Sequence, residues 1–246
     1  MQSLVVAGHS QITAFLPAPE DASAPVLIDG EGVRVLHGPE LRADPYWLAF
    51  AKAEPEAPHV IVWRGDQHLR TLLMEPTPPI DFVLSAAPDL PLDPRASYVT
   101  ESQLRALFAP SFAGLAEVIG QLRQAELTVL VAGTPPPIGE VEALTRRLPR
   151  DPQFAPLLQS SEAGPAAAVG LSSPYTLQKV WSLLQMMLGE AAAANGARFV
   201  PVPDRTRTQE GFLAPAYWSD DPIHANAAFA REMAADLRAA LGEGEA

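Results

Sequence analysis

The sequence contains no cysteine, and this absence excludes several classes of protein at once. Without thiols there is no disulfide framework, no cysteine-ligated zinc or iron–sulfur site and no thiol nucleophile. Long apolar runs are missing too. The stretch from Trp181 to Ala194 is interrupted by Gln185 and Glu190, whereas a membrane span needs about 20 consecutive, mostly apolar residues. The chain does not begin with a basic segment followed by an apolar one, the pattern of an export signal, so we expect a cytoplasmic protein.

Positive charge is also scarce. The chain has 17 Lys and Arg residues against 29 Asp and Glu residues, which gives a formal net charge of −12. Nucleic-acid binding needs a basic surface that neutralises phosphates, and anionic membranes attract basic segments. We therefore expect neither nucleic acid nor membrane as a partner. The sequence also lacks the glycine-rich loops that bind dinucleotides and nucleoside triphosphates. No cofactor and no metal is predicted, and no oligomeric state is indicated.

The apolar pattern that is present favours an α/β fold. The 246 residues, 48% of them hydrophobic, suit one domain with a sizeable core. Short apolar runs alternate with longer stretches of helical periodicity, as in a parallel sheet covered on both faces. We expect one domain over residues 1–246, with a frayed tail at 242–246. Strands are predicted at Ser3–Ala7, Val33–Leu36, His59–Trp63, Phe82–Leu84, Thr128–Ala132 and Arg198–Val202.

Three helices have clear periodicity. They are predicted at Glu101–Gln124, Tyr175–Asn195 and Asn226–Leu241. Pro110 should break the first of them, because proline removes a backbone donor and clashes with the preceding turn. Two long proline-rich connections, at 85–100 and 149–174, are predicted to be loops of the kind that form binding sites.

Reactive side chains gather at three places where predicted strands or loops end. Open α/β sheets place their sites at the carboxyl ends of the strands. The three clusters are Gly8-His9-Ser10-Gln11, Arg64-Gly65-Asp66-Gln67-His68 and Ser219 to Asn226.

The first and third clusters together hold the parts of a serine nucleophile system. A serine hydroxyl needs a base, and a histidine serves best when a carboxylate holds its ring. Asp221 and His224 are three residues apart, so one turn brings both to the same side. Structural alternatives exist for each. Ser10 can cap the helix after the first strand, and Asp220 or Asp221 can cap the last helix, with Pro222 at its first position.

The motifs at the two ends of the chain resemble the first and last blocks of the SGNH/GDSL hydrolases. The resemblance implies a three-layer α/β/α sandwich, flavodoxin-like, around a parallel sheet of about five strands. It also implies ester hydrolysis without a metal, in which Ser10 is the nucleophile, His224 the base and Asp221 its orienting partner.

The oxyanion hole that the resemblance implies is divergent here. Ser10 and Gly38 would contribute, with Gly32 as an alternative glycine. Asp66 stands where the family has an asparagine, and an ionised aspartate only accepts hydrogen bonds. Either Gln67 presents its carboxamide instead, or Asp66 is protonated by desolvation. Otherwise the protein is a weakened or inactive relative.

Four further residues are candidates for substrate binding: His9, His68, Thr134 and Trp218. Thr134 begins a proline-rich loop that either walls a pocket or simply leaves its strand rigidly. Trp218, with Tyr217, is either an aromatic platform or part of the core. His9, His68 and Asp66 also raise the alternative of a metal site.

The leading hypothesis is a serine esterase that removes a small acyl group, such as acetyl, from a hydroxylated compound, for example an acylated carbohydrate. A ligand-binding protein on the same scaffold and an acyltransferase with the same triad are the alternatives. The nucleophile elbow of α/β-hydrolases fits less well, because Ile12 stands where that motif needs a glycine.

Overall fold

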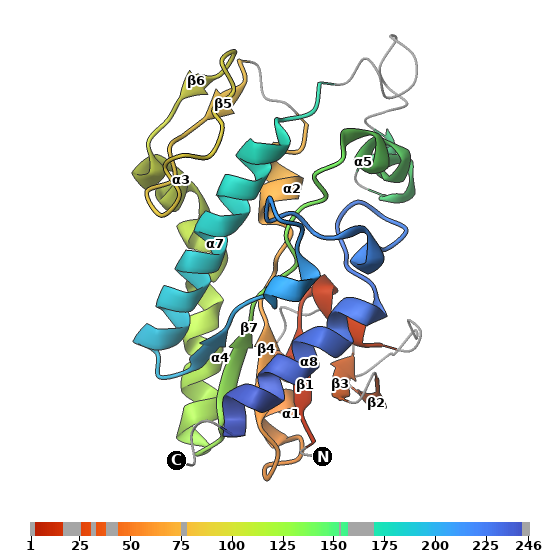
Figure 1. The fold of residues 1–246 in the computed structure, drawn as a ribbon. Helices are drawn as coiled ribbons and strands as arrows, with labels where there is room; N and C mark the ends of the chain where they lie inside the picture. The colour runs from red at the N-terminus through yellow and green to blue at the C-terminus, as the bar shows by residue number, and fades with distance from the viewer. Residues whose placement is uncertain are drawn as a thin grey trace.

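The computed structural model describes residues 3–16, 26–30, 33–37, 44–74, 78–152, 154–156 and 170–242. Its main sheet has six strands in the order β2-β3-β1-β4-β7-β8 (Figure 1). They are β1 (Val5–Gly8), β2 (Val26–Asp29), β3 (Arg34–His37), β4 (His59–Val62), β7 (Val129–Ala132) and β8 (Arg198–Val200). Every neighbouring pair is parallel except β2 and β3. The predicted α/β class is confirmed, with one antiparallel strand added at the edge.

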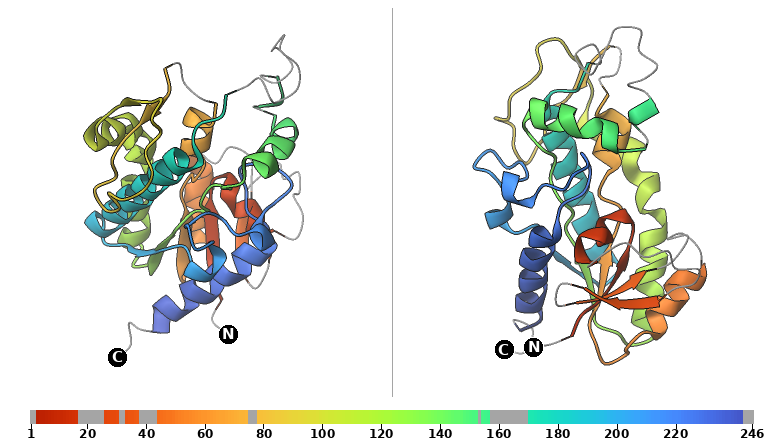
Figure 2. Two further views of the ribbon diagram at one scale, coloured as in Figure 1. Left: turned by 45° about the horizontal axis from the view of Figure 1, so that its top comes forward. Right: turned by 90° about the vertical axis from the view of Figure 1, so that its right-hand side faces the viewer.

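Helices cover both faces of this sheet. The helices of the described residues are α1 (Asp44–Lys52), α2 (Gln67–Leu72), α3 (Glu101–Phe108), α4 (Ala113–Gln124), α5 (Val141–Arg147), α7 (Pro174–Ala194) and α8 (Ala227–Gly242). Figure 2 shows α8 on one side of the sheet and α1 with α4 on the other. Short 3₁₀ turns are η1 (Ser10–Phe15), η2 (Ala109–Phe112), η3 (Leu148–Arg150), η4 (Asp204–Thr206) and η5 (Pro215–Tyr217). The result is a three-layer α/β/α sandwich.

The alternation of side chains along the strands divides the core into two layers. In β1 and the residue before it, Leu4 and Val6 pack with α8, whereas Val5 and Ala7 pack with α1 and α4. All four side chains are fully buried. Successive residues of a strand point to opposite faces, so alternate side chains of β1 pack against opposite faces of the sheet. The same alternation bears on His9 and Ser10, the two residues that follow the strand.

A third apolar cluster lies beyond the carboxyl ends of the strands. It joins α2, α3, α5 and the first half of α7. A small parallel pair, β5 (Ile80–Asp81) and β6 (Ser97–Tyr98), belongs to the same end of the molecule (Figure 1). Lys179 of α7 and Asp81 of β5 form a buried ion pair there, with 2.7 Å between Nζ and Oδ1. This pair ties the small sheet to α7.

Several predicted elements are confirmed and one is wrong. The helix predicted at Glu101–Gln124 is broken around Pro110 into α3, η2 and α4. Phe82–Leu84 is not a strand; the extended residues are Ile80 and Asp81, which pair with β6 outside the main sheet. Phe82 and Leu84 are buried in the third apolar cluster, so their apolar character reflects burial alone.

The ends of the described ranges limit two predictions. Helix α8 continues to Gly242, the first residue of the predicted tail, and residues 243–246 lie outside the described part of the chain. The loop at 149–174 is described only in part. No helix in the described ranges is both long and apolar enough to cross a membrane.

Candidate active site

Ser10 lies directly beyond the carboxyl end of β1, at the first position of η1. The strand ends at Gly8, where a Cβ would approach the Val62 carbonyl oxygen of β4 to 2.0 Å, so only glycine fits. The Tyr46 hydroxyl of α1 fixes this strand end. It accepts from the Gly8 N–H at 3.0 Å and donates to the Leu36 carbonyl at 2.8 Å. The turn that carries Ser10 therefore starts from a rigid point.

Asp221 organises the loop that precedes α8. Its Oδ1 accepts the backbone N–H groups of Ile223 and His224, both at 2.8 Å. Its Oδ2 lies 3.0 Å from His224 Nδ1. Since a carboxylate only accepts hydrogen bonds, Nδ1 carries the proton and donates it to Oδ2. The other ring nitrogen, Nε2, is then the basic one.

The hydrogen bonds of Asp221 keep it ionised. Its partial burial alone would raise the pKa, but the hydrogen bond from His224 and the backbone donors outweigh this and lower the pKa to about 2. A carboxylate that stays charged at neutral pH holds the imidazole in one tautomer. It also stabilises an imidazolium when the ring accepts a proton.

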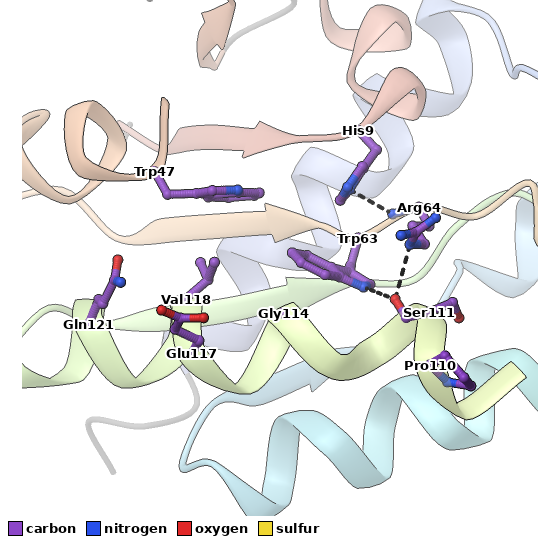
Figure 3. Close-up of a pocket in the computed structure, with 10 residues that line it drawn as sticks. All are labelled: His9, Trp47, Trp63, Arg64, Pro110, Ser111, Gly114, Glu117, Val118 and Gln121. Carbon is purple, nitrogen blue, oxygen red and sulfur yellow. Dashed lines mark hydrogen bonds between the residues drawn. The ribbon is translucent and has the colours of Figure 1, made fainter. Parts of the chain in front are cut away.

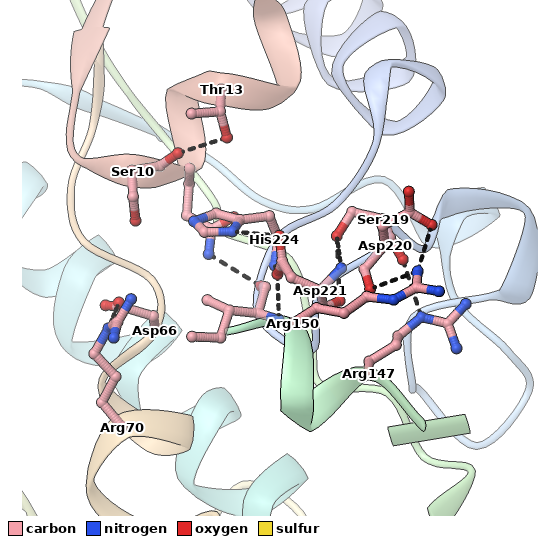
Figure 4. Close-up of polar contacts among 12 residues, drawn as sticks. Ser10, Thr13, Asp66, Arg70, Arg147, Arg150, Ser219, Asp220, Asp221 and His224 are labelled. Atoms are coloured by element: carbon pink, nitrogen blue, oxygen red, sulfur yellow. Dashed lines mark hydrogen bonds and ion pairs between the residues drawn. The ribbon is translucent and has the colours of Figure 1, made fainter. Parts of the chain in front are cut away.

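The basic nitrogen of His224 is buried and makes no hydrogen bond within the described part of the chain. Unpartnered buried polar atoms are uncommon in native proteins. In Figure 4 the ring extends from Asp221 towards the side on which Ser10 lies. The Ser10 hydroxyl makes no hydrogen bond to another described residue, and His224 Nε2 is not bonded to it. Reactive pairs are often loosely aligned before substrate binds.

Gln11 connects the two ends of the chain at this point. The residue after Ser10 is almost fully buried, and its Nε2 donates to the carbonyl of Ile223 at 3.2 Å. Ile223 immediately precedes His224. One hydrogen bond between positions 212 residues apart thus joins the turn of Ser10 to the loop of His224. The structure brings the first and last predicted motifs together.

Two arginines that the sequence analysis missed brace the same loop. Arg147 donates from Nε to the Ser219 carbonyl at 3.0 Å, and its guanidinium lies 4.9 Å from the ring centre of Trp218. Arg150 contacts the Asp220 side chain at 3.0 Å. Trp218 donates its indole N–H to the Leu213 carbonyl and is half-buried. No sequence signal marks these arginines, because they come from α5 and η3, some 70 residues away.

The block at residues 64–68 is held by contacts of its own. Asp66 forms an ion pair with Arg70, one helical turn along α2. Gln67 accepts from the Gly65 N–H at 2.9 Å through Oε1 and donates to the Ser111 hydroxyl at 3.3 Å. A carboxylate paired with a guanidinium is ionised, so the ion pair does not favour the alternative in which Asp66 is protonated and donates to the oxyanion. Gly38 and Gly32 lie outside the described residues.

His9 faces the other side of the sheet from Ser10. Its backbone is still extended, so the alternation of β1 continues through it. Its ring packs edge-on against Trp63, with 4.7 Å between centroids, and its Nδ1 accepts the Arg64 N–H at 3.1 Å (Figure 3). His9 therefore lines a cavity between α1 and α4.

His68 and Thr134 are both fully buried. Burial lowers the pKa of His68 to about 3, against the opposing charge of Asp66, and neither ring nitrogen has a partner in the described residues. Thr134 exchanges hydrogen bonds with Gln185 and accepts the indole N–H of Trp181. The predicted contact of these two residues with substrate is therefore not available in this structure.

The alternative metal site is not formed. Within the described residues no three histidine, aspartate or glutamate side chains come together in a way that would hold a metal ion. His9 points to the α1 and α4 side, whereas His68 is buried at the start of α2.

Sequence comparison matches the chain to no family and to no curated protein. Structure comparison aligns 99% of it, at 14% identity, with three solved structures. They are named as an acylhydrolase from Bacteroides fragilis (88% of that chain, TM-score 0.46), a GDSL-like lipase from Bacteroides thetaiotaomicron (89%, 0.46) and an arylesterase from Agrobacterium tumefaciens (99%, 0.42). Similarity this distant carries no argument about activity, which has to come from the chain's own residues.

Proposed function

We propose that this chain is a serine hydrolase that cleaves a small acyl ester with Ser10, His224 and Asp221. One observation carries the proposal: the His224 ring is held by Asp221 on one nitrogen and keeps its other nitrogen buried and unpartnered among the described residues. The Gln11–Ile223 hydrogen bond joins this ring's loop to the turn of Ser10. A buried, unpartnered base beside a serine at a strand end is the arrangement that nucleophilic catalysis needs.

Acylation follows from these roles. His224 Nε2 removes the proton of the Ser10 hydroxyl as Oγ attacks the ester carbonyl carbon. The Asp221 carboxylate stabilises the imidazolium that forms. When the tetrahedral intermediate collapses, the bond to the alcohol oxygen breaks, and His224 returns the proton to that oxygen. The alcohol leaves and the acyl group remains on Ser10.

Deacylation repeats the cycle with water. His224 takes a proton from water as the water oxygen attacks the acyl carbonyl, and then gives it to Ser10 Oγ as the carboxylic acid departs. An alcohol acceptor in place of water would make the same chain an acyltransferase.

The oxyanion is proposed to bind backbone donors first. The N–H of Ser10 stands at the first position of η1, where no intrahelical partner exists. Gly38 is the proposed second donor. Gln67 is already bonded to Gly65 and Ser111, so it contributes only through its remaining amide hydrogen. Asp66 contributes no donor while it is paired with Arg70. We therefore propose a weak oxyanion hole and slow turnover.

Hydrolysis of para-nitrophenyl acetate by the purified protein tests the proposal. Wild type should release para-nitrophenol, and Ser10→Ala should not. Thr13→Ala is the matched control, because its hydroxyl lies on the same turn and bonds the Ser10 carbonyl without a role in the chemistry. Equal rates for wild type and Ser10→Ala would overturn the proposal.

A ligand-binding protein without catalysis is the second candidate, and the Asp66–Arg70 ion pair favours it. A negative charge near a developing oxyanion opposes acyl transfer. If this candidate is correct, an acylated sugar binds to folded wild-type protein and is recovered intact, with no acid released.

A further inference from the structure

The cavity lined by His9 lies between α1 and α4, on the opposite face of β1 from His224, and has a volume of about 180 Å³ (Figure 3). This volume is below the range of about 300–1,000 Å³ that is typical of sites for drug-sized ligands. It suits a single small ring. The cavity is lined by His9, Trp47, Trp63, Arg64, Pro110, Ser111, Gly114, Glu117, Val118 and Gln121.

One wall of the cavity is aromatic. Trp47 and Trp63 are in contact, with 5.7 Å between ring centroids and 33° between ring planes. His9 stands edge-on to Trp63. Both indoles are largely buried, at 7% and 6% exposure, and both line the cavity. Such a wall accepts the apolar face of a ligand.

The facing wall is polar and comes from one side of α4. Gly114, Glu117, Val118 and Gln121 follow the three- and four-residue spacing that places side chains on one helix face. Glu117 supplies acceptors, and Gln121 supplies a donor and an acceptor. Gly114 keeps the space open, because a Cβ there would lie 3.2 Å from the Trp63 ring.

Arg64 lies at one end of the cavity, beside His9 and Ser111 (Figure 3). Its backbone has φ +53°, a strained value for a residue other than glycine, and such strain gathers at binding and catalytic sites. Its Nε donates to the Ser111 carbonyl at 3.0 Å. The positive charge of Arg64 balances the negative charge of Glu117, so the cavity favours a neutral ligand over a cation or an anion.

The cavity continues towards the proposed catalytic residues. A second hollow of about 380 Å³ shares Arg64, Pro110 and Ser111 with it and reaches Asp66 and Arg70. In Figure 4 the side chain of Ser10 points towards the side on which Asp66 and Arg70 lie. A ligand held between the tryptophans and α4 can therefore extend past Arg64 into this second hollow, towards Asp66.

We propose that the Trp47–Trp63 cavity binds one pyranose ring of a carbohydrate, and that an acyl group on the same carbohydrate is the one presented to Ser10. The second clause rests on the proposed function; the first does not. A pyranose is neutral, has an apolar face for the indoles and carries hydroxyls for Glu117 and Gln121.

The indole N–H signals in a ¹H–¹⁵N NMR spectrum test the binding directly. The chain has four tryptophans, so Trp181 and Trp218 are internal controls, and Trp47→Phe and Trp63→Phe assign the other two. Glucose, xylose, mannose, galactose and N-acetylglucosamine are titrated one by one. At least one sugar should shift the Trp47 and Trp63 signals and leave the other two in place. The cation tetramethylammonium is titrated as well, because aromatic walls also bind quaternary ammonium ions. No shift with any of the five sugars would overturn the proposal. A shift with tetramethylammonium and with none of the sugars would overturn it too.

Variants on α4 connect binding to specificity. Gln121→Ala should weaken the sugar that binds by about fivefold, the value of one neutral hydrogen bond. Gln124→Ala, an exposed position on the same helix outside the cavity, should leave its affinity unchanged. Equal affinity in Gln121→Ala and wild type would remove α4 from the site.

Kinetics separate this inference from the proposed function. For an acetate ester of that sugar, Gln121→Ala should raise KM about fivefold with kcat unchanged, and KM for para-nitrophenyl acetate should not move. If wild type hydrolyses neither ester, the proposed function fails, and the NMR titration still shows whether the cavity binds a sugar. If it hydrolyses both and KM does not change, the sugar site fails and the hydrolase remains.

Discussion

Two carboxylates in this molecule, Asp81 and Asp221, lie at similar distances from a side-chain nitrogen, but the two pairs differ in how completely their polar atoms are hydrogen-bonded. Asp81 and Lys179 are joined at 2.7 Å and are 0% and 1% exposed. Asp81 also accepts the backbone N–H groups of Phe82 and Asp93, and Lys179 donates to the Pro91 carbonyl. Asp221 and His224 are joined at 3.0 Å and are 29% and 18% exposed. Here the outer nitrogen of the histidine has no partner in the described part of the chain.

Under the proposed function, the difference separates a structural pair from a reactive one. Buried charges need hydrogen bonds on every polar atom to offset their desolvation, and the Asp81–Lys179 pair meets this requirement. The Asp221–His224 pair satisfies the inner nitrogen and leaves the outer one without a partner in the described part of the chain, as the proposed function requires of a base for Ser10. We therefore expect substitutions in the first pair to act on stability and substitutions in the second to act on catalysis.

The largest effect is expected from His224→Ala. Removal of the base should lower kcat for para-nitrophenyl acetate by about 10⁴- to 10⁶-fold, because a triad acts as a unit. The thermal midpoint should change little, since the ring is not part of the main apolar clusters. The matched measurement is Lys179→Met, whose specific activity per folded molecule should equal wild type. A large activity loss in Lys179→Met at full folding would break the comparison.

Asp221→Asn is expected to act next in size. The amide does not hold the ring in the productive tautomer, so kcat should fall by about 10⁴-fold. Stability should fall by less than in Lys179→Met, because this pair is partly exposed. A pH–rate profile checks the cause. If the loss is the same across the profile, Asp221 orients the ring as proposed; if Asp221→Asn only moves the profile along the pH axis, the orienting role is contradicted.

The sequence indicates one of these two pairs, Asp221–His224, and gives no sign of the other. Residue types and spacing predict Ser10, Asp221 and His224 as a triad, and of this the structure shows the Asp221–His224 hydrogen bond. Strands β1, β4 and β7 were found because residues buried on both faces give continuous apolar runs. Lys179 was unremarkable in sequence, since its partner Asp81 lies far away along the chain and the pattern of α7 only requires an apolar face.

The failures share one cause, which is that position along the chain does not report burial. Phe82–Leu84 has the apolar pattern of a strand and packs among helices instead. His68 and Thr134 follow strands and are nevertheless fully covered. Strand β2 was missed because its residues are half-exposed at the sheet edge. Gln11 gave no sign that it would bond a residue at the other end of the chain.

Lys179→Met is expected to give the largest loss of stability. It leaves the Asp81 carboxylate buried without its cation, and the free energy of unfolding should fall by about 3–5 kcal/mol. The double variant Asp81→Asn/Lys179→Met should recover part of this loss, because no charge is then left uncompensated. Chemical denaturation of the three proteins measures both values. A double variant that is less stable than Lys179→Met would contradict the assignment of a charge-paired core.

Asp66→Asn is expected to raise turnover. The change replaces an acceptor by a donor at the proposed oxyanion block, and one such donor is worth about 10²-fold in other hydrolases. Because the amide of this variant lacks the ion pair with Arg70 that holds the wild-type carboxylate, we expect a smaller gain, about tenfold. Arg70→Ala is the control for loss of the pair alone. A rate that falls in Asp66→Asn would show that the carboxylate itself takes part.

The last prediction concerns His68 and the pH dependence of stability, and its effect appears only in acid. Burial lowers its pKa from 6.5 to about 3, so between these values the unfolded chain binds a proton that the folded chain does not. Stability must therefore fall as the pH is lowered from 6.5 towards 3, by up to about 1.4 kcal/mol per pH unit. His68→Leu should have a shallower slope over the upper part of this range. Asp221 does not interfere in that upper part, because its ordinary pKa of 3.8 and its lowered pKa of about 2 in the folded protein both lie below it.

The central claim is that His224 activates Ser10, and covalent labelling with a fluorophosphonate tests it most directly. The reagent is attacked by an activated serine oxygen and stays bound to it. Mass spectrometry of the digested wild-type protein should find the adduct on Ser10, and labelling of His224→Ala should be slower by several orders of magnitude. A folded wild-type protein without an adduct on Ser10, or equal labelling rates in the two proteins, would contradict the account.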